Sequence, residues 1–295
     1  MIDADNPRNR LIGIGLISAT FLCFALLDCG AKWLVRSLPV FEVVFLRFLT
    51  HVIFTTALLA PRHGRALLRS NRPGLQLLRA AFLPIMTALN FWALQYLQLA
   101  ETGAIQFSVP ILIALFAAPM LGERMDAARW AAIVVGFAGV LIIIRPGMQG
   151  FHPALLLSMM TAVLYALFNL LTRRLASHDS PETTQFYSGL IATAAMAPFA
   201  LATWQSPSGA LQWTILVLIG IAGGLGHYLL ALAHRYAPAS VLAPFLYQQI
   251  VWMILFGYLV FGDVPGTAVV LGGTVVIASG AYLFYRERSA VRGGR

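Results

Sequence analysis

The sequence predicts an all-α membrane protein with ten transmembrane helices. Of its 295 residues, 59% are hydrophobic and only 11% are charged, and the mean hydropathy is +0.80, whereas a soluble domain carries about 25% charged residues. Apolar runs fill almost the whole chain, each close to the roughly 20 residues that a helix needs to cross a bilayer. The predicted spans are 11–34, 40–60, 77–97, 102–121, 129–145, 153–173, 184–203, 211–233, 240–260 and 266–285.

The first span is expected to stay in the membrane and not to be removed as a signal peptide. Its flank mixes Asp3 and Asp5 with Arg8 and Arg10. No small-residue cleavage site follows a short apolar core, as it would in a secretory signal.

Basic residues set the expected orientation of all ten spans. If the N-terminus lies in the cytoplasm, all but four of the 20 basic residues fall in inner segments. The exceptions are Lys32, Arg36 and Arg145 in outer segments, and Arg47 within a span. The positive-inside rule then predicts a multi-pass protein of the bacterial inner membrane with both termini in the cytoplasm. The net charge of +9 is thus a topology signal, and no nucleic-acid partner is expected.

The two halves of the chain match each other at a nearly constant offset. The segment FALLDCGAKWL (24–34) aligns with YALFNLLTRRL (165–175), and LGE (121–123) aligns with FGD (261–263). This match indicates a duplication, with repeats at 1–147 and 148–295 inside one membrane domain. Because each repeat has five helices, the second must enter the membrane in the opposite sense. Inverted repeats place a binding site near the midplane, as in many transporters.

These features together resemble the EamA type of the drug/metabolite transporter superfamily. The resemblance covers nearly all of the chain and includes LGERM (121–125) and FGDVP (261–265) after the fourth and ninth spans. Asp263 stands where the family more often has Glu. The resemblance implies export or exchange of small metabolites, prominently amino acids, and the sequence is similar to bacterial aromatic amino-acid exporters.

The fifth and tenth spans carry small residues at helical spacing and no strongly polar residue near their centres. Small residues let helices approach each other closely. Both spans therefore look like a scaffold or a homodimer surface, as the corresponding helices do in the resembled family. The small residues are Ala128, Ala132, Gly136, Gly139, Ala268, Gly272, Ser279 and Gly280.

Polar and aromatic side chains gather at mid-depth in several other spans, counting about 1.5 Å of rise per residue. An amide buried alone in the bilayer would be unfavourable, so these amides either bridge helices or face a cavity. Their number at one depth favours a substrate-binding cavity, and glycines of the eighth span leave room at that level. The candidates are Phe24, Asn90, Tyr165, Gln248 and Gln249, with Gln106 further out and His227 towards the cytoplasm.

The ninth span, LAPFLYQQIVWMILFGYLV (242–260), places polar groups on one helical face. Pro244, Gln248 and Trp252 follow at a spacing of four, with Tyr247 beside them. We expect Gln248 to bind the polar end of a solute, and Trp252 and Tyr247 to contact its apolar or aromatic end. The alternative has Gln248 bonded permanently to another helix, at Asn90 or Tyr165.

Helix breakers and one buried charge complete the candidates. Pro84, Pro110 and Gly224 interrupt or weaken their spans as either static kinks or hinges. Arg47 lies deep in the second span, and Asp28 lies at a matching depth in the first. A structural ion pair between them is favoured over a substrate-binding arginine or a snorkelling side chain.

Enzyme chemistry finds no support in the sequence. It contains no HExxH, GxSxG or Walker motif, and its six histidines lack metal-ligand spacing. No metal or cofactor is therefore expected. Mid-depth offers neither the cluster of cations that phosphate needs nor the carboxylate that a cationic drug needs.

The sequence thus predicts a secondary carrier of a neutral or zwitterionic solute, working by alternating access. Amino acids, including aromatic ones, are the expected cargo, by export or by exchange. A carrier of a nucleoside or an adenosyl compound is the alternative, and a membrane-embedded enzyme or a channel is less favoured. Direction, ion coupling and oligomeric state stay open.

Overall fold

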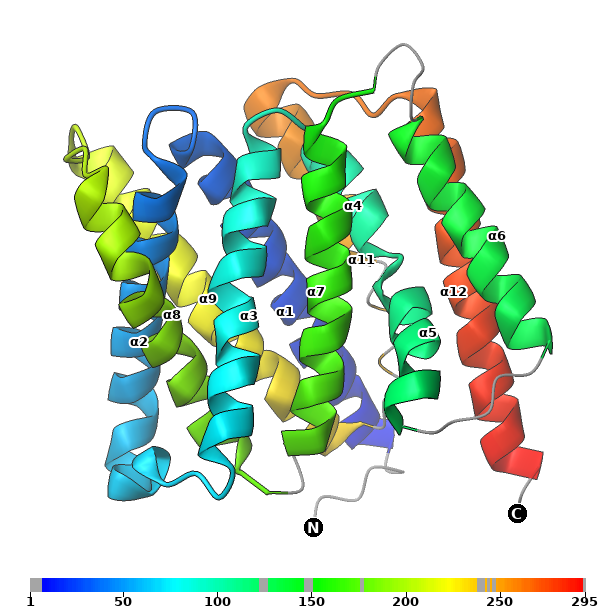
Figure 1. Cartoon of the computed structure of the whole chain (residues 1–295), viewed down its shortest axis with the longest axis horizontal. Helices are drawn as coiled ribbons and strands as arrows, with labels where there is room; N and C mark the ends of the chain where they lie inside the picture. Colours follow the sequence, from blue (N-terminus) through cyan, green and yellow to red (C-terminus); the bar gives the residue numbers. More distant parts are fainter. Residues whose placement is uncertain are drawn as a thin grey trace.

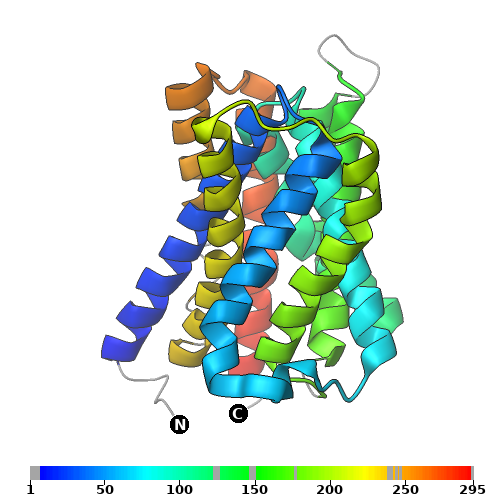
Figure 2. The same cartoon turned by 90° about the vertical axis from the view of Figure 1, so that its left-hand side faces the viewer.

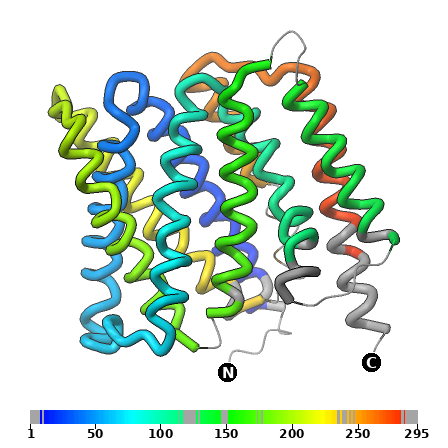
Figure 3. Tube along the Cα trace, viewed as in Figure 1, coloured from blue at the N-terminus to red at the C-terminus, as the bar shows by residue number. Residues whose placement is uncertain are grey.

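The computed structural model describes residues 7–121, 127–145, 151–175, 178–237, 242, 245 and 248–293, and this part of the chain contains no strand. The first half holds α1 (Pro7–Leu34), α2 (Val40–His63), the 3-10 helix η1 (Gly64–Leu68), α3 (Pro73–Leu94), α4 (Leu99–Gln106), α5 (Val109–Leu121) and α6 (Ala127–Ile144). The second half holds α7 (Ala154–Leu175), α8 (Pro181–Ala202), α9 (Ala210–Tyr236), α11 (Gln248–Phe256), the π-helix η3 (Gly257–Phe261) and α12 (Thr267–Gly293). Figures 1 and 3 trace this path.

Six helical segments of the described chain are long and apolar enough to cross a membrane. They are Leu11–Leu34, Val40–Leu68, Pro73–Leu94, Ala154–Thr172, Pro181–Ala202 and Ala210–Ala233. Shorter apolar segments are Leu99–Ile113, Trp130–Ile144, Gln248–Phe261 and Thr267–Tyr282. These lengths and compositions are those of a polytopic membrane protein, as the sequence predicts, while the division into ten full spans stays a prediction.

The chain crosses the molecule in alternating directions, with α4 and α5 running the same way as two parts of one interrupted crossing. In Figure 1, α1 rises from the lower end and α12 finishes at that same end. Helix α7 descends from the upper end, although the sequence offset makes it the counterpart of α1. Opposed directions of this kind are what an inverted repeat requires.

Helix packing links the two halves throughout. Helix α1 packs on α9, and α3 packs on α7. Because α1 of the first half corresponds to α7 of the second, and α3 corresponds to α9, these two contacts are equivalent in the two halves. Helix α2 packs on α8 and α6 on α12, each helix on its own counterpart. Figure 2 shows α9 between α1 and α2, with α8 on the other side of α2.

Small residues of α6 and α12 meet inside one chain. A Cβ atom added at Gly272 would lie 2.5 Å from the carbonyl oxygen of Gly139, and one added at Gly139 would lie 2.9 Å from that of Gly272. The Ser279 hydroxyl donates to the carbonyl of Ala132 at 2.5 Å. The scaffold role expected for these two spans therefore uses their small residues within the chain. A homodimer would have to use their other faces.

The three candidate hinges have different surroundings. Pro84 is buried inside a continuous α3. Pro110 lies in the first turn of α5, after the chain breaks between Gln106 and Val109. Proline is well suited to a first turn, because its missing N–H would have no partner there. Gly224 lies in a continuous α9, where an added Cβ would be 3.0 Å from the ring of Phe54 on α2. Motion at any of them stays a prediction.

Candidate functional site

A central cavity of about 170 Å³ lies between helices of both halves. Helices α1, α2, α3 and α4 supply one part of its wall, and α7, α9 and α11 supply the other. A second cavity of about 270 Å³ adjoins it, because both cavities are lined by Phe24, Gln106, Tyr165, Gln249 and Met253. Together they form a space in the middle of the molecule that is reached by side chains distant in sequence.

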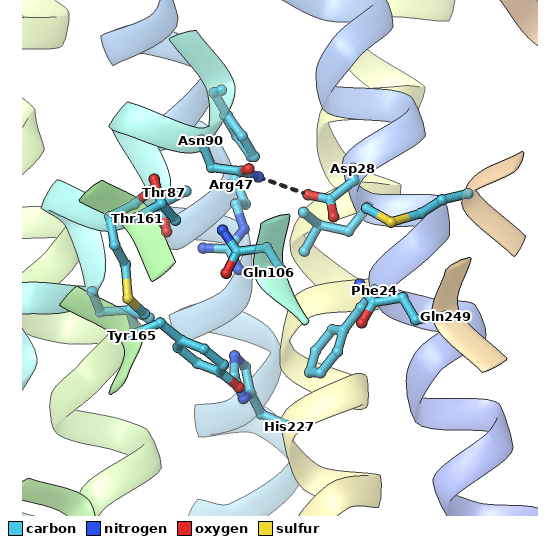
Figure 4. A pocket seen from close by; sticks show the side chains of 15 residues that line it. Phe24, Asp28, Arg47, Thr87, Asn90, Gln106, Thr161, Tyr165, His227 and Gln249 are labelled. Atoms are coloured by element: carbon cyan, nitrogen blue, oxygen red, sulfur yellow. Dashed lines mark hydrogen bonds between the residues drawn. The ribbon is translucent and has the colours of Figure 1, made fainter. Parts of the chain in front are cut away.

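Most of the predicted substrate-binding residues come together at this cavity. Figure 4 shows them projecting from different helices towards one space. Phe24, Asn90, Gln106, Tyr165, His227 and Gln249 all line it. Tyr247 lies outside the described residues.

Gln248 and Trp252 differ from the prediction, because they line neither of the two cavities. Helix α11 turns its Gln249 and Met253 face inwards, and adjacent residues lie about 100° apart around a helix. Trp252 instead stacks on Phe256, with ring centroids 6.2 Å apart. The alternative is not seen among the described residues either: Oε1 of Gln248 is buried without a hydrogen-bond partner, and the Asn90 side chain bonds Asp28 instead.

The predicted ion pair between Asp28 and Arg47 is not seen as a direct salt bridge among the described residues, so a paired role for these two side chains stays a prediction. Both residues line the cavity, but no salt bridge joins them in the described structure, where Lys32 and Asp263 form one. The Asp28 carboxylate accepts a hydrogen bond from Nδ2 of Asn90 at 3.0 Å. Matching depth was the basis of the prediction, and depth does not determine the direction in which each side chain leaves its helix.

Arg47 is nearly enclosed by protein, with only 4% of its surface exposed. Its Cζ atom lies 4.2 Å from the centre of the Phe48 ring. A Cβ atom at Gly223 of α9 would approach Nη2 of Arg47 to 3.1 Å. Nevertheless Nε and Nη1 have no hydrogen-bond partner. The guanidinium is therefore held in place by packing, with donors still unused.

The glycines of α9 allow neighbouring helices to pack closely against it. An added Cβ at Gly226 would lie 2.6 Å from the ring of Phe24, and one at Gly220 would lie 2.5 Å from Cβ of Thr50. The room predicted beside the eighth span is thus filled by side chains of α1 and α2. What remains open lies between these helices and α3, α4, α7 and α11.

His227 lies between the central cavity and a third pocket. Its ring is 5.0 Å from that of Phe24 and 6.1 Å from that of His51, centroid to centroid. The third pocket, of about 210 Å³, extends to Arg62 near the end of α2 and to Pro181 at the start of α8. In Figure 1 these helix ends lie at the end of the molecule that carries the termini. His227 therefore lies between the central cavity and a pocket at that end of the molecule.

Sequence reasoning missed several residues of the lining. On α3 the cavity face repeats at spacings of three and four, a helical pattern that extends from the predicted Asn90 and could have revealed the rest. The missed residues of this face are Leu83, Met86, Thr87 and Phe91. Thr161 on α7, four residues before Tyr165, has the same relation to its predicted neighbour.

Near the end of the molecule away from the termini lies an ion pair that sequence reasoning also missed. Nζ of Lys32 on α1 lies 2.7 Å from Oδ2 of Asp263, which follows η3. The same ammonium donates to the carbonyl of Leu97 at 2.9 Å. Asp263 belongs to the FGDVP segment, so the motif contributes a contact between the two halves.

The model of the EamA-like transporter family matches residues 11–145 and again 152–286. The chain belongs to the EamA-like transporter family. This confirms the resemblance to EamA-type transporters drawn from the sequence, while the similarity to aromatic amino-acid exporters stays a prediction.

Named relatives align over nearly their full length. This EamA-like chain is 26% identical to the S-adenosylmethionine uptake transporter of Rickettsia felis, over 97% of each chain. It is 30% identical to the riboflavin transporter of Vibrio cholerae, over 92% of each chain. The pseudopaline exporter of Pseudomonas aeruginosa is 25% identical over 90% of this chain and 94% of its own. A solved crystal structure with 23% identity and a TM-score of 0.63, covering 92% of this chain and 98% of its own, shares the fold.

Proposed function

We propose that the protein is a secondary carrier for a small metabolite that combines an aromatic ring with a polar chain. The observation that carries this proposal is the central cavity, which both halves of the chain line with aromatic and amide side chains. Phe24 and Tyr165 offer ring faces for stacking. Gln106 and Gln249 offer donors and acceptors that fix the orientation of a polar chain, as in most small-molecule sites.

An adenosyl compound such as S-adenosylmethionine is the substrate that we favour. The relatives named as S-adenosylmethionine uptake transporters align with 97% of this chain, and the cavity side chains suit an adenine ring. An aromatic amino acid is the second candidate, because it combines a ring with the same zwitterionic group at smaller size. The relatives do not support it by name. Since they include uptake transporters and an exporter, we propose exchange along the gradients of the solute.

The proposed mechanism is alternating access of two inverted five-helix repeats, at 1–147 and 148–295. It is supported by the opposed directions of α1 and α7 (Figure 1) and by the reciprocal packing of helices. We further propose the bacterial inner membrane as the location, with both termini in the cytoplasm. The homodimer through the fifth and tenth spans is a weaker part of the proposal. It is supported only by apolar side chains such as Val134 and Leu271, exposed by 64% and 62%.

Counterflow in liposomes tests this function. Purified protein is reconstituted into vesicles loaded with unlabelled S-adenosylmethionine, riboflavin or tryptophan, and uptake of the same labelled compound is followed. A carrier concentrates the label transiently, whereas a pore or an enzyme does not. We expect counterflow with S-adenosylmethionine. If none of the three compounds gives counterflow, the proposal fails.

A further inference from the structure

Arg47 has hydrogen-bonding capacity that no described residue uses. The residue is buried, with 4% of its surface exposed, it lines the central cavity, and Nε and Nη1 of its guanidinium are buried without partners. An ionised group away from water is strongly unfavourable unless it is paired. The packing against Phe48 and Gly223 holds the guanidinium deep in the bundle. Its missing partner must therefore come from the contents of the cavity.

Gln106 has the same deficit at the same cavity. Its Nε2 atom is buried and has no hydrogen-bond partner. Three unused donor atoms, two on Arg47 and one on Gln106, border the same cavity, and they call for a group rich in acceptors. A carboxylate is such a group, and a guanidinium binds it with two parallel hydrogen bonds.

Asp28 supplies the opposite charge to this space. It projects from α1 while Arg47 projects from α2, and Asn90 holds one of its carboxylate oxygens at 3.0 Å. Figure 4 shows Asp28 and Asn90 together, with Gln106 and Arg47 beside them and the Phe24 and Tyr165 rings further along the cavity. Opposite charges that face one cavity without forming a salt bridge complement a zwitterion. A phosphate dianion would instead meet repulsion from Asp28.

We propose that Arg47 and Gln106 bind the carboxylate, and Asp28 the ammonium, of a solute with an α-amino acid head group. Its ring then lies against Phe24 and Tyr165. This inference rests on the proposed carrier function and narrows its substrate class. It admits S-adenosylmethionine and aromatic amino acids, which share this head group, and it excludes riboflavin, which has neither charge.

The test compares solutes that differ only in the carboxylate. Binding of S-adenosylmethionine and of decarboxylated S-adenosylmethionine to the purified protein is measured by competition, and tryptophan and tryptamine form a second arm. For the arm that contains the true substrate, the intact protein should prefer the carboxylated member about tenfold to a hundredfold, the range for hydrogen bonds to charged groups. Arg47→Gln should abolish this preference, and Arg47→Lys should retain part of it because the charge remains.

Two controls separate recognition from structure. Arg36→Gln removes an exposed arginine that lies over the Phe261 ring, and it should leave the preference unchanged. Because Arg47 has no protein acceptor, Arg47→Gln should melt at or above the temperature of the intact protein.

The outcomes are distinguishable from failure of the carrier function. If Arg47→Gln keeps the preference, or melts early or fails to fold, the arginine is structural and the inference is wrong. Counterflow of riboflavin with neither arm bound would also overturn it, while leaving the carrier function intact. If no compound gives counterflow, both the proposed carrier function and this inference are wrong.

Discussion

Arg47 and Arg79 are both buried arginines of membrane-spanning helices, yet their bonding differs. Nε of Arg79 donates to the Thr172 hydroxyl and Nη1 donates to the Ser188 hydroxyl, both at 2.6 Å. Its Cζ atom also lies 4.1 Å from the centre of the Phe168 ring. The sequence places Arg79 only among the inner basic residues, because charge counting does not detect a side chain turned into the protein. Arg79 therefore joins α3 to α7 and α8, whereas Arg47 is left for the cavity.

Arg79→Gln should destabilise the protein, in contrast to Arg47→Gln. Glutamine cannot reach both hydroxyls, so buried groups lose hydrogen bonds and a loss of about 1–3 kcal/mol is expected. Thermal unfolding in detergent measures it. An Arg79→Gln variant that melts like the intact protein would show that these two hydrogen bonds contribute little.

Gln249→Ala should weaken substrate binding, and Gln248→Ala is its matched control. Gln249 lines both adjoining cavities, while Gln248 lines neither. A lost polar partner lowers affinity by about 1–3 kcal/mol, so competition binding should show a clear shift for Gln249→Ala alone. Equal losses for both variants would mean that α11 presents a different face to the solute.

At the scale of helices, the sequence predicts where each helix lies along the chain and the depth of its residues, but it does not predict which face of the helix turns towards the cavity. Apolar length and periodicity locate the helical segments, and depth counting brings Phe24, Asn90 and Tyr165 to one level. Which face of each helix turns inwards depends on packing against helices distant in sequence. For that reason the inward face of α11 is displaced by one residue, from Gln248 to Gln249. The unpaired Asp28 and Arg47 have the same cause.

The sequence shows that α9 is rich in glycine, but only the fold shows why: these glycines lie where α9 packs closely on α1 and α2. Gly220→Ala should destabilise the bundle, because the new Cβ would lie 2.8 Å from the backbone oxygen of Arg47 and 2.5 Å from Cβ of Thr50. Overpacking of this kind costs about 1–3 kcal/mol. Gly15→Ala on α1 is the matched control, since nothing lies within 4 Å of its added Cβ. Melting temperatures compare the two, and an equal response would contradict close α2–α9 packing.

At the scale of the whole molecule, the chain consists of two halves that each match the same family model. Helices of one half pack on helices of the other. The sequence predicts this organisation because the offset between repeats is readable from local similarity. It could not predict the Lys32–Asp263 ion pair, whose partners lie in different halves and 231 positions apart.

Breaking that ion pair should favour opening at the end away from the termini. Lys32→Gln removes the charge that holds Asp263 at 2.7 Å. In a cysteine-free background, a cysteine replacing Thr87 of the cavity should then react faster with an impermeant maleimide applied from that side. Arg36→Gln is the control of similar charge change. Unchanged labelling in Lys32→Gln would show that the pair does not hold this end closed.

The alignment of the two halves predicts a second pair of residues that corresponds to this ion pair. Lys32 aligns with Arg173, and Asp263 aligns with Glu123; the Arg173 side chain and Glu123 lie outside the described structure. If the halves exchange roles during transport, Arg173 and Glu123 should pair when the cavity opens away from the termini. Reversing either charge alone, by Arg173→Glu or Glu123→Arg, should slow exchange in liposomes. Combining both reversals should restore much of the rate, because the attraction is rebuilt with opposite polarity. A double variant no faster than either single one would show that these residues do not pair during transport.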